Sequence, residues 1–296
     1  MSLAAPPRPW VGRALPRAED RRFVKGEAKY AGDLTLPDVL HAAFVRSLYA
    51  HGRIVSVDVD AVRAMPGVRA VLTAADVEEL VDPFPLVASG GAEIVPAMHP
   101  VLASDRVRYV GQPVVLVVAE TPELAADAAE YVLVDVEELN AVVDPRGAER
   151  APPLHGAAPD NVLLRWQRAT GDVDAVFDGA DAVVGVRVIV PRLIAAPIEA
   201  RVVLASHDVE TDILTLWLSA QDQHRQLAGL TKVLRRPAER LRIVVPDVGG
   251  AFGSKGVPQA ETAAVALAAL ALGGLLAIAP AWRAARTPAG VVLRTE

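Results

Sequence analysis

Hydrophobic positions in the first half of the chain follow the two-residue period of half-buried strands. Valine recurs at every second position from Val55 to Val59, which is typical of a strand with one buried face. Residues 40–59 therefore predict a strand, a turn and a second strand. The continuous apolar run 114–119 predicts a strand buried on both faces. Three further strands are expected at residues 68–73, 107–110 and 132–136.

Helix signals lie between these predicted strands. Thr121 followed by Pro122 is a typical helix start, and it predicts a helix that runs to about Tyr131. Two shorter helices are also expected. One follows Asp60, which is its expected N-cap, and the other begins at Ala74. Strands mixed with short helices indicate an α+β unit. Residues 83–100, rich in proline and glycine, predict a loop, and residues 148–161 predict a linker.

The second half of the chain predicts another group of strands and helices. Strands are expected at residues 181–190, 201–206, 213–219 and 241–245, and helices at 226–234 and 259–272. The uncharged stretch 262–282 is long enough to cross a membrane, but it is mostly alanine. We interpret it as a buried helix that ends at Gly273 and Gly274.

Composition narrows the function classes. The 296 residues hold 30 basic and 36 acidic side chains, for a net charge of −6, which argues against nucleic acid as the main partner. The chain has no cysteine, which excludes disulfides, thiolate zinc sites and iron–sulfur clusters within it. The first ten residues have no secretory pattern, so we expect a cytoplasmic protein.

A glycine-rich segment, residues 245–256 with the sequence VPDVGGAFGSKG, lies between a predicted strand and a predicted helix. Free backbone N–H groups at such a turn bind anions. The segment has neither the Walker spacing nor the Rossmann spacing. Taken alone, it is equally compatible with a structural turn.

Two other places carry candidate chemistry. Residues 219–224 (SAQDQH) follow a predicted strand, and Gln221 could orient a ligand through its amide; the alternative is a polar turn before a helix. Glu199 could hold a pterin or a nearby loop, or form an ion pair with Arg201 or Arg192. The six histidines lack tight metal-ligand spacing, and no G-x-S-x-G elbow is present.

At these residues the chain resembles the molybdopterin-binding large subunit of the xanthine dehydrogenase and aldehyde oxidase family, including carbon monoxide dehydrogenase. The resemblance extends from residue 17 to about 273. The matching segments, in family order, are 26–30 (GEAKY) with Asp33 and Leu34, Arg46 and Ser47 with 50–54 (AHGRI), 66–68 (PGV), 99–103 (HPVLA), 107–113 (VRYVGQP), 159–161 (PDN), 197–201 (PIEAR), 219–221 (SAQ) with His224, and 247–255 (DVGGAFGSK).

The resemblance implies an α/β hammerhead domain over residues 17–147 and a linker over 148–170. The start of a molybdenum-cofactor domain follows over 171–273. Residues 1–16 form an extension and 274–296 an atypical tail. Family enzymes oxidise an aldehyde, an N-heterocycle or CO with oxygen from water. The implied cofactor is molybdenum–molybdopterin, in the cytosine dinucleotide form. Electrons would pass to an iron–sulfur small subunit and an FAD-binding medium subunit, in a dimer of heterotrimers without a membrane span.

The resemblance also assigns site residues. Gln221 matches the family glutamine that positions a molybdenum oxo ligand. Gly249, Gly250, Ala251, Phe252 and Gly253 match the loop that lies against the cofactor. Ala251 replaces the usual third glycine, which costs roughly 1 kcal/mol or more if that position requires a positive φ. Ala220 replaces the usual threonine.

The largest departure from the family pattern is length. Family subunits are more than twice as long, and their essential glutamate base lies in the part that this chain lacks. After Gly273 the sequence fits no family pattern, and we interpret this as a frameshift or truncation; a divergent C-terminus is the alternative. The alternative function is a catalytically inactive fragment that acts as a scaffold or interaction module. The substrate is not determined by these residues.

Overall fold

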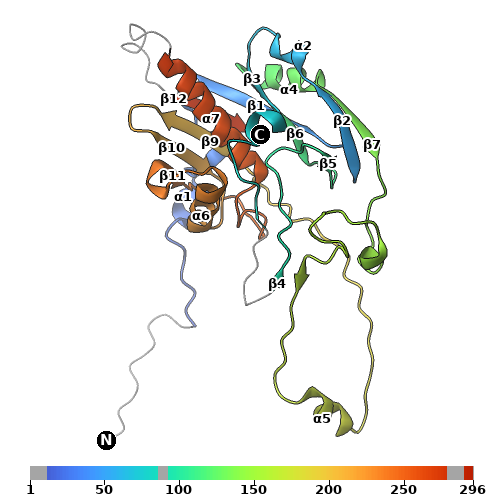
Figure 1. Cartoon of the computed structure of the whole chain (residues 1–296). Coiled ribbons are helices and arrows are strands. Elements are labelled where there is room, and N and C mark those ends of the chain that lie inside the picture. Colours follow the sequence, from blue (N-terminus) through green and yellow to red (C-terminus); the bar gives the residue numbers. More distant parts are fainter. Residues whose placement is uncertain (1–11, 86–92, 279–289, 296) are drawn as a thin grey trace, which may run out of the picture.

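A seven-stranded sheet forms the centre of the molecule (Figure 1). The computed structural model describes residues 12–85, 93–278 and 290–295. The sheet has the strand order β11-β10-β9-β12-β1-β6-β3. Its strands are β1 (Val39–Arg46), β3 (Val68–Leu72), β6 (Pro113–Ala119), β9 (Val203–Asp208), β10 (Ile213–Leu218), β11 (Leu241–Val244) and β12 (Gly290–Thr295). Strand β12 pairs in parallel with β1 and antiparallel with β9, so one sheet joins both halves of the chain.

Two smaller sheets accompany it. The three-stranded sheet has the order β5-β2-β7, with β5 (Arg106–Val107), β2 (Gly52–Asp58) and β7 (Leu133–Glu138). The two-stranded sheet consists of β4 (Glu93–Ile94) and β8 (Leu164–Arg165). A Cβ atom on Gly52 would overlap the Val136 side chain of the neighbouring strand, so close strand pairing requires glycine here.

The predicted first-half elements are largely confirmed. Thr121 caps α4 (Pro122–Glu130) and accepts a 3.1 Å hydrogen bond from the backbone N–H of Leu124. Three details differ. The strand expected at 107–110 is only β5, and the expected loop 83–100 contains the short strand β4. Asp60 lies inside α2, whose N-cap position is Val59 without a side-chain cap. The remaining helices are α1 (Asp20–Val24), η1 (Ala31–Asp33), α2 (Asp60–Arg63), α3 (Ala74–Val77), η2 (Ala148–Arg150), α5 (Val173–Asp178), α6 (Gln223–Val233), η3 (Ala238–Arg240) and α7 (Ala260–Ile278).

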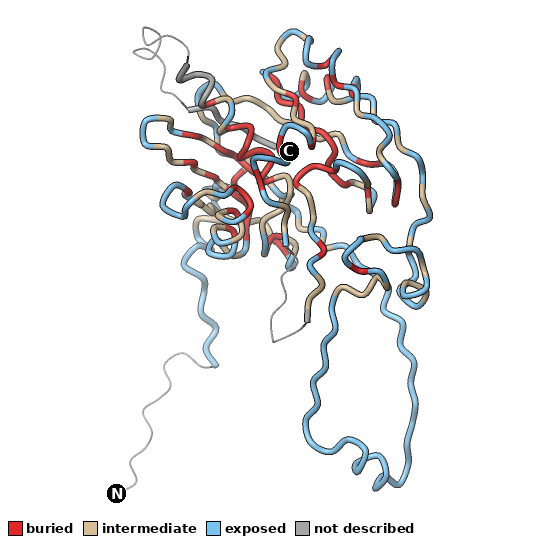
Figure 2. Tube along the Cα trace, in the orientation of Figure 1, coloured by how far each residue is buried: buried red, intermediate tan, exposed pale blue. Residues whose placement is uncertain are grey.

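Strand β6 separates two hydrophobic cores. Leu116 and Val118 belong to the core that includes α7, β9 and β10, whereas Val115 and Val117 belong to the core beneath α4. All seven residues of β6 are buried, as Figure 2 shows for the centre of the molecule. This position between two cores explains why the sequence of β6 is continuously apolar rather than alternating.

Helix α7 continues past the glycines at which we expected it to end. It extends to Ile278 and packs on β9 and β12. A Cβ atom on Gly273 would lie 3.0 Å from Nδ1 of His207, so this glycine permits close helix–sheet packing instead of ending the helix. Among the described residues, no helix combines the length and the hydropathy that a membrane crossing requires.

The prediction of a strand at residues 181–190 is wrong. This segment is extended and exposed, and it makes no backbone hydrogen bond within the described part of the chain. It belongs to a long exposed segment, residues 166–194, which includes α5 and stands away from the rest of the molecule (Figures 1 and 2). We call this segment the excursion. Val184 and Ile194 are 83% and 90% exposed. The apolar pattern is that of a strand, but a strand forms only where a neighbouring strand completes its hydrogen bonds.

We expect limited trypsin digestion to cut this excursion first. Arg187 and Arg192 are exposed on a backbone without hydrogen bonds, and local opening there costs little free energy. Mass spectrometry should detect early cleavage after both residues. An R187Q/R192Q variant should lose these cuts and survive longer. Earlier cleavage after Arg63, which lies in helix α2, would contradict the arrangement.

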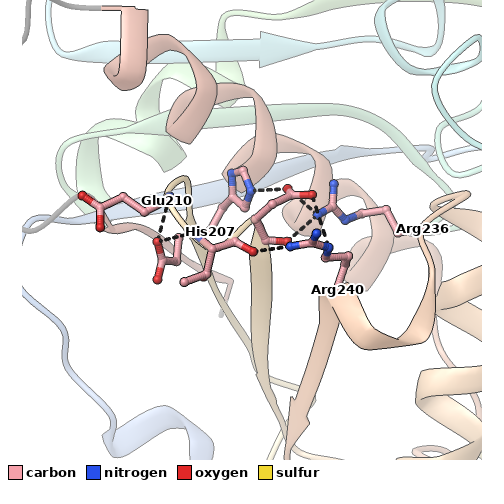
Figure 3. A network of polar contacts seen from close by, with 7 residues as sticks. His207, Glu210, Arg236 and Arg240 are labelled. Carbon is pink, nitrogen blue, oxygen red and sulfur yellow. Dashed lines mark hydrogen bonds and ion pairs between the residues drawn. The ribbon is translucent and has the colours of Figure 1, made fainter.

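A polar network holds the β9–β10 hairpin against the segment that follows α6 (Figure 3). The Asp212 carboxylate accepts a 2.6 Å hydrogen bond from Arg236 and lies 3.0 Å from Nε2 of His207. Arg240 donates to the backbone carbonyl of Thr211. These partners, Arg236 first and His207 second, lower the pKa of Asp212. The network fixes the start of β10, whose other end leads into the site.

Candidate functional site

The glycine-rich segment forms an open loop between β11 and α7. Three of its residues have a positive φ: Gly250 at 100°, Phe252 at 49° and Gly253 at 88°. The backbone N–H groups of residues 250–253 make no hydrogen bond within the described part of the chain. Four consecutive backbone donors are therefore available to a ligand with acceptor atoms, the kind of arrangement in which backbone N–H groups bind anions. Phe252 is 78% exposed, so its left-handed conformation is not explained by core packing.

Ala251 does not carry the strain that its replacement of a glycine could cause. It is not among the residues with a positive φ, and it is buried with 8% exposure. Its carbonyl accepts hydrogen bonds from the backbone N–H and the hydroxyl of Ser254. The alanine is therefore compatible with this loop, and the positions that use a positive φ lie beside it.

Gln221 lies directly against the end of this loop. Its backbone N–H donates to the carbonyl of Lys255 at 3.0 Å, and its side-chain Oε1 accepts from the Lys255 N–H at 3.3 Å. The side-chain NH₂ of Gln221 makes no hydrogen bond within the described residues. The fold thus brings together Gln221 and Lys255, which lie 34 residues apart in the sequence, and it leaves an amide donor beside the loop.

A hollow of about 300 Å³ lies at the end of β10. Residues 220–224 and Val245 line it. The same residues also form the start of α6, because the Asp222 carboxylate accepts from the Arg225 N–H at 2.9 Å. The polar turn that we considered as an alternative is therefore present, and it forms the wall of the hollow.

Glu199 holds the loop, and its ion-pair partner is not one that we expected. Its Oε2 accepts from the Gly249 N–H at 2.7 Å and lies 3.0 Å from Nζ of Lys255. Neither Arg201 nor Arg192 pairs with it in the described structure. Sequence reasoning missed Lys255 and Ser219 as its partners. The lysine at the end of the glycine loop and the serine beside Gln221 were the available signals.

The first glycine of the loop is required by close packing. A Cβ atom on Gly249 would lie 2.6 Å from Cβ of Glu199 and 3.5 Å from Cε1 of Tyr30. The carbonyl of Gly249 also accepts from the Glu199 N–H at 3.2 Å. The loop therefore begins pressed between two segments that lie far from it in the sequence.

The N-terminal GEAKY segment anchors the beginning of the loop. The Asp247 carboxylate accepts from the Lys29 N–H at 2.9 Å and forms a two-oxygen ion pair with Arg22. The Asp247 N–H donates to the Lys29 carbonyl at 3.1 Å, and Tyr30 forms a β-bridge with Asp247. These contacts lower the pKa of Asp247 to about 2, chiefly through Arg22.

This anchor predicts a pH dependence of stability. Because the pKa of Asp247 is lower in the folded chain than the usual value of about 3.9, its contribution is complete above about pH 4. It is lost as the pH falls towards 2. Urea midpoints of wild type and D247N should differ at pH 6, and the difference should shrink between pH 4 and pH 2.5. A difference independent of pH would contradict the assignment.

Comparison with known proteins agrees with this geometry. Residues 25–140 match the family model described as "Aldehyde oxidase and xanthine dehydrogenase, a/b hammerhead domain". Residues 154–280, which contain the loop and Gln221, match "Molybdopterin cofactor-binding domain". The chain belongs to the xanthine dehydrogenase and aldehyde oxidase family. The expected fold, a hammerhead domain followed by the start of a molybdenum-cofactor domain, is confirmed.

Individual relatives show how much of the family protein is present. The chain is 42% identical over 247 residues to the nicotine 6-hydroxylase large subunit of Paenarthrobacter nicotinovorans. This alignment covers 83% of this chain and 30% of the relative. It is 36% identical to the carbon monoxide dehydrogenase large chain of Hydrogenophaga pseudoflava, covering 81% and 31%. Quinoline 2-oxidoreductase from Pseudomonas putida 86 superposes with a TM-score of 0.82 and 33% identity, covering 96% and 34%. The chain therefore spans about a third of these relatives.

Proposed function

We propose that this chain seats a molybdenum–molybdopterin cofactor on the loop of residues 249–253, as part of a molybdenum hydroxylase large subunit. The observation that carries the proposal is the row of four unpaired backbone amides at residues 250–253, beside the free amide of Gln221. Backbone donors bind phosphate, oxygen and sulfur acceptors without a charged side chain. The match of this region to a molybdopterin-binding model supports the same ligand.

Each part of the site has its own role in the proposal. The amides of Gly250, Ala251, Phe252 and Gly253 donate to acceptor atoms of the cofactor. Gln221 uses its side-chain NH₂ to orient the metal end. When bound, the cofactor supplies two-electron oxidation of a carbon centre with oxygen from water. Turnover takes place in a full-length subunit, which contributes the base that this family requires.

The wider assembly is part of the same proposal. Because the chain has no cysteine, the iron–sulfur clusters of the proposed assembly belong to a small partner subunit. FAD is assigned, in the same proposal, to a medium subunit. The proposed cofactor form is the cytosine dinucleotide, and the proposed assembly is a cytoplasmic dimer of heterotrimers. The family model is named for aldehyde oxidase, and two relatives are named for nicotine and carbon monoxide, so the proposed substrate is an aldehyde, an N-heterocycle or CO.

A negative charge introduced on the loop tests the proposal. A Cβ atom on Gly253 would meet nothing within 4 Å, so G253D adds a negative charge without a clash. G253N is the matched control, since asparagine has the same shape and also tolerates a positive φ. After production in a host that makes molybdopterin, we expect wild type to retain pterin and molybdenum. G253D should retain at least tenfold less than G253N.

The exposed apolar excursion favours a second candidate function. Residues 183–194 present large hydrophobic side chains to solvent, including Val184, Val190 and Ile194, and surfaces of this kind bind partners. The chain would then be a catalytically inactive scaffold. Folded wild-type chain without pterin, and equal behaviour of G253D and G253N, would favour this candidate. Stoichiometric molybdenum on the purified chain would eliminate it.

A further inference from the structure

Lys255 is the largest fully buried side chain in the described structure. Its side chain is 0% exposed, which is rare for lysine unless the charge is paired. Three acceptors surround its Nζ atom: the Glu199 carbonyl at 2.9 Å, the Glu199 carboxylate at 3.0 Å and the Ser219 hydroxyl at 2.6 Å. An ammonium group has three protons, so every donor of Lys255 has an acceptor.

The buried cluster of Lys255, Glu199 and Ser219 joins both ends of the glycine loop to the end of β10. The Ser219 hydroxyl donates to the Glu199 carboxylate at 2.6 Å. The same carboxylate oxygen binds the N–H of Gly249, where the loop begins, and Lys255 is where the loop ends. The other carboxylate oxygen, Oε1, is buried without a partner among the described residues. The hydrogen bonds of this carboxylate therefore hold Gly249 and Lys255, at the two ends of the loop, against Ser219 at the end of β10.

The backbone of Lys255 is at the same time the support of Gln221. Its carbonyl accepts from the Gln221 N–H and from the side chain of Gln226 at 3.3 Å, and its N–H donates to Oε1 of Gln221. Nothing else in the described structure binds the Gln221 amide. A shift of Lys255 would therefore move the Gln221 side chain and the end of the loop together.

We propose that Lys255 is a positioning residue, which through Glu199 and Ser219 sets the placement of Gln221 and of the glycine loop before any ligand binds. This inference rests on the proposed function for its purpose, but its geometry concerns this chain alone. Preorganised donors that need no rearrangement bind an acceptor group more effectively than mobile ones. Lys255 would act by holding these donors and would not touch the ligand.

Amide hydrogen exchange of the 296-residue chain without cofactor tests the proposal. In K255M, we expect the amides of Gly249, Gln221 and Lys255 to exchange at least tenfold faster than in wild type. The control is L214A, since Leu214 is fully buried at the opposite end of β10. It lowers global stability without touching the cluster. Equal exchange of the three amides in K255M and L214A would overturn the proposal.

Two further variants keep the test decisive if K255M does not fold. E199Q/K255M has no buried charge, and it still lacks the Nζ bonds, so it should fold and show fast exchange at Gln221. E199Q alone retains an acceptor for Gly249 and Lys255 but leaves the Lys255 charge without its carboxylate, so its Gln221 amide should exchange faster than in wild type and more slowly than in the double variant. Wild-type-like exchange in the double variant would overturn the proposal. Pterin retention is measured in a separate experiment. If wild type retains no pterin, the proposed function is refuted. The amide hydrogen exchange of the variants would still decide whether Lys255 is a positioning residue.

Discussion

Replacing Glu199 with alanine is expected to lower the free energy of unfolding by about 3–5 kcal/mol. The variant leaves the Lys255 ammonium buried with a carbonyl and a hydroxyl as its remaining acceptors. It also removes the acceptor of the Gly249 N–H. Removing one partner of a buried pair costs far more than the pair contributes, because the other charge loses its compensation. Urea unfolding at pH 7 measures the change.

The exposed ion pair between Arg53 and Glu137 is the matched control. Its side chains are 62% and 50% exposed, so E137A should cost less than about 1 kcal/mol. Adding K255M to E199A should cost little more than E199A alone, because the two residues act as a pair. A loss below about 1 kcal/mol in E199A would show that the cluster is not buried as described.

The second large effect is expected from G249A. The added Cβ would meet Cβ of Glu199 at 2.6 Å and the Glu199 backbone at 3.6 Å, so the loop or the Glu199 segment must move. Overpacking of this kind costs about 1–3 kcal/mol. Since the moved segment carries the amide donors, we expect pterin retention to fall at least tenfold. Thermal unfolding and pterin content are the two measurements.

G156A is the control for the glycine substitution itself. A Cβ atom at Gly156 would meet nothing within 4 Å, and its φ is not positive, so little change is expected in stability or pterin content. Wild-type stability in G249A would contradict the close approach. Normal pterin retention with reduced stability would separate the packing of the loop from its proposed role.

Local features of the fold were predictable from sequence because they depend on neighbouring residues. Thr121 and Pro122 define a helix start by themselves, and the valine alternation predicts β2, although a bulge between Ile54 and Ser56 breaks the alternation and leaves Val55 57% exposed. The strand at 181–190 was not predictable in the same way. Its apolar pattern shows that it could form a strand, but the presence of a neighbouring strand depends on the rest of the fold. Gly273 illustrates the same limit, because its packing partner His207 lies 66 residues earlier.

The site was predictable in its parts but not in its connections. The glycine loop and Gln221 were found from their patterns and from the family resemblance. The partner of Glu199 was not, because Arg201 is two residues away whereas Lys255 is 56 residues away. Sequence proximity favoured the arginines. In the folded chain Lys255 is the partner of Glu199, because a buried lysine requires a carboxylate. The sequence does not show that Lys255 is buried.

The anchor between Arg22 and Asp247 has a consequence for how the chain reaches its native state. The two residues are 225 positions apart, so closing this contact carries the entropy cost of a very long loop. During synthesis, residues 22–30 emerge well before their partner is made. Contacts of such long range form slowly. We expect this N-terminal segment to remain undocked during translation and to attach late, which makes the loop anchor one of the last parts of the molecule to become ordered.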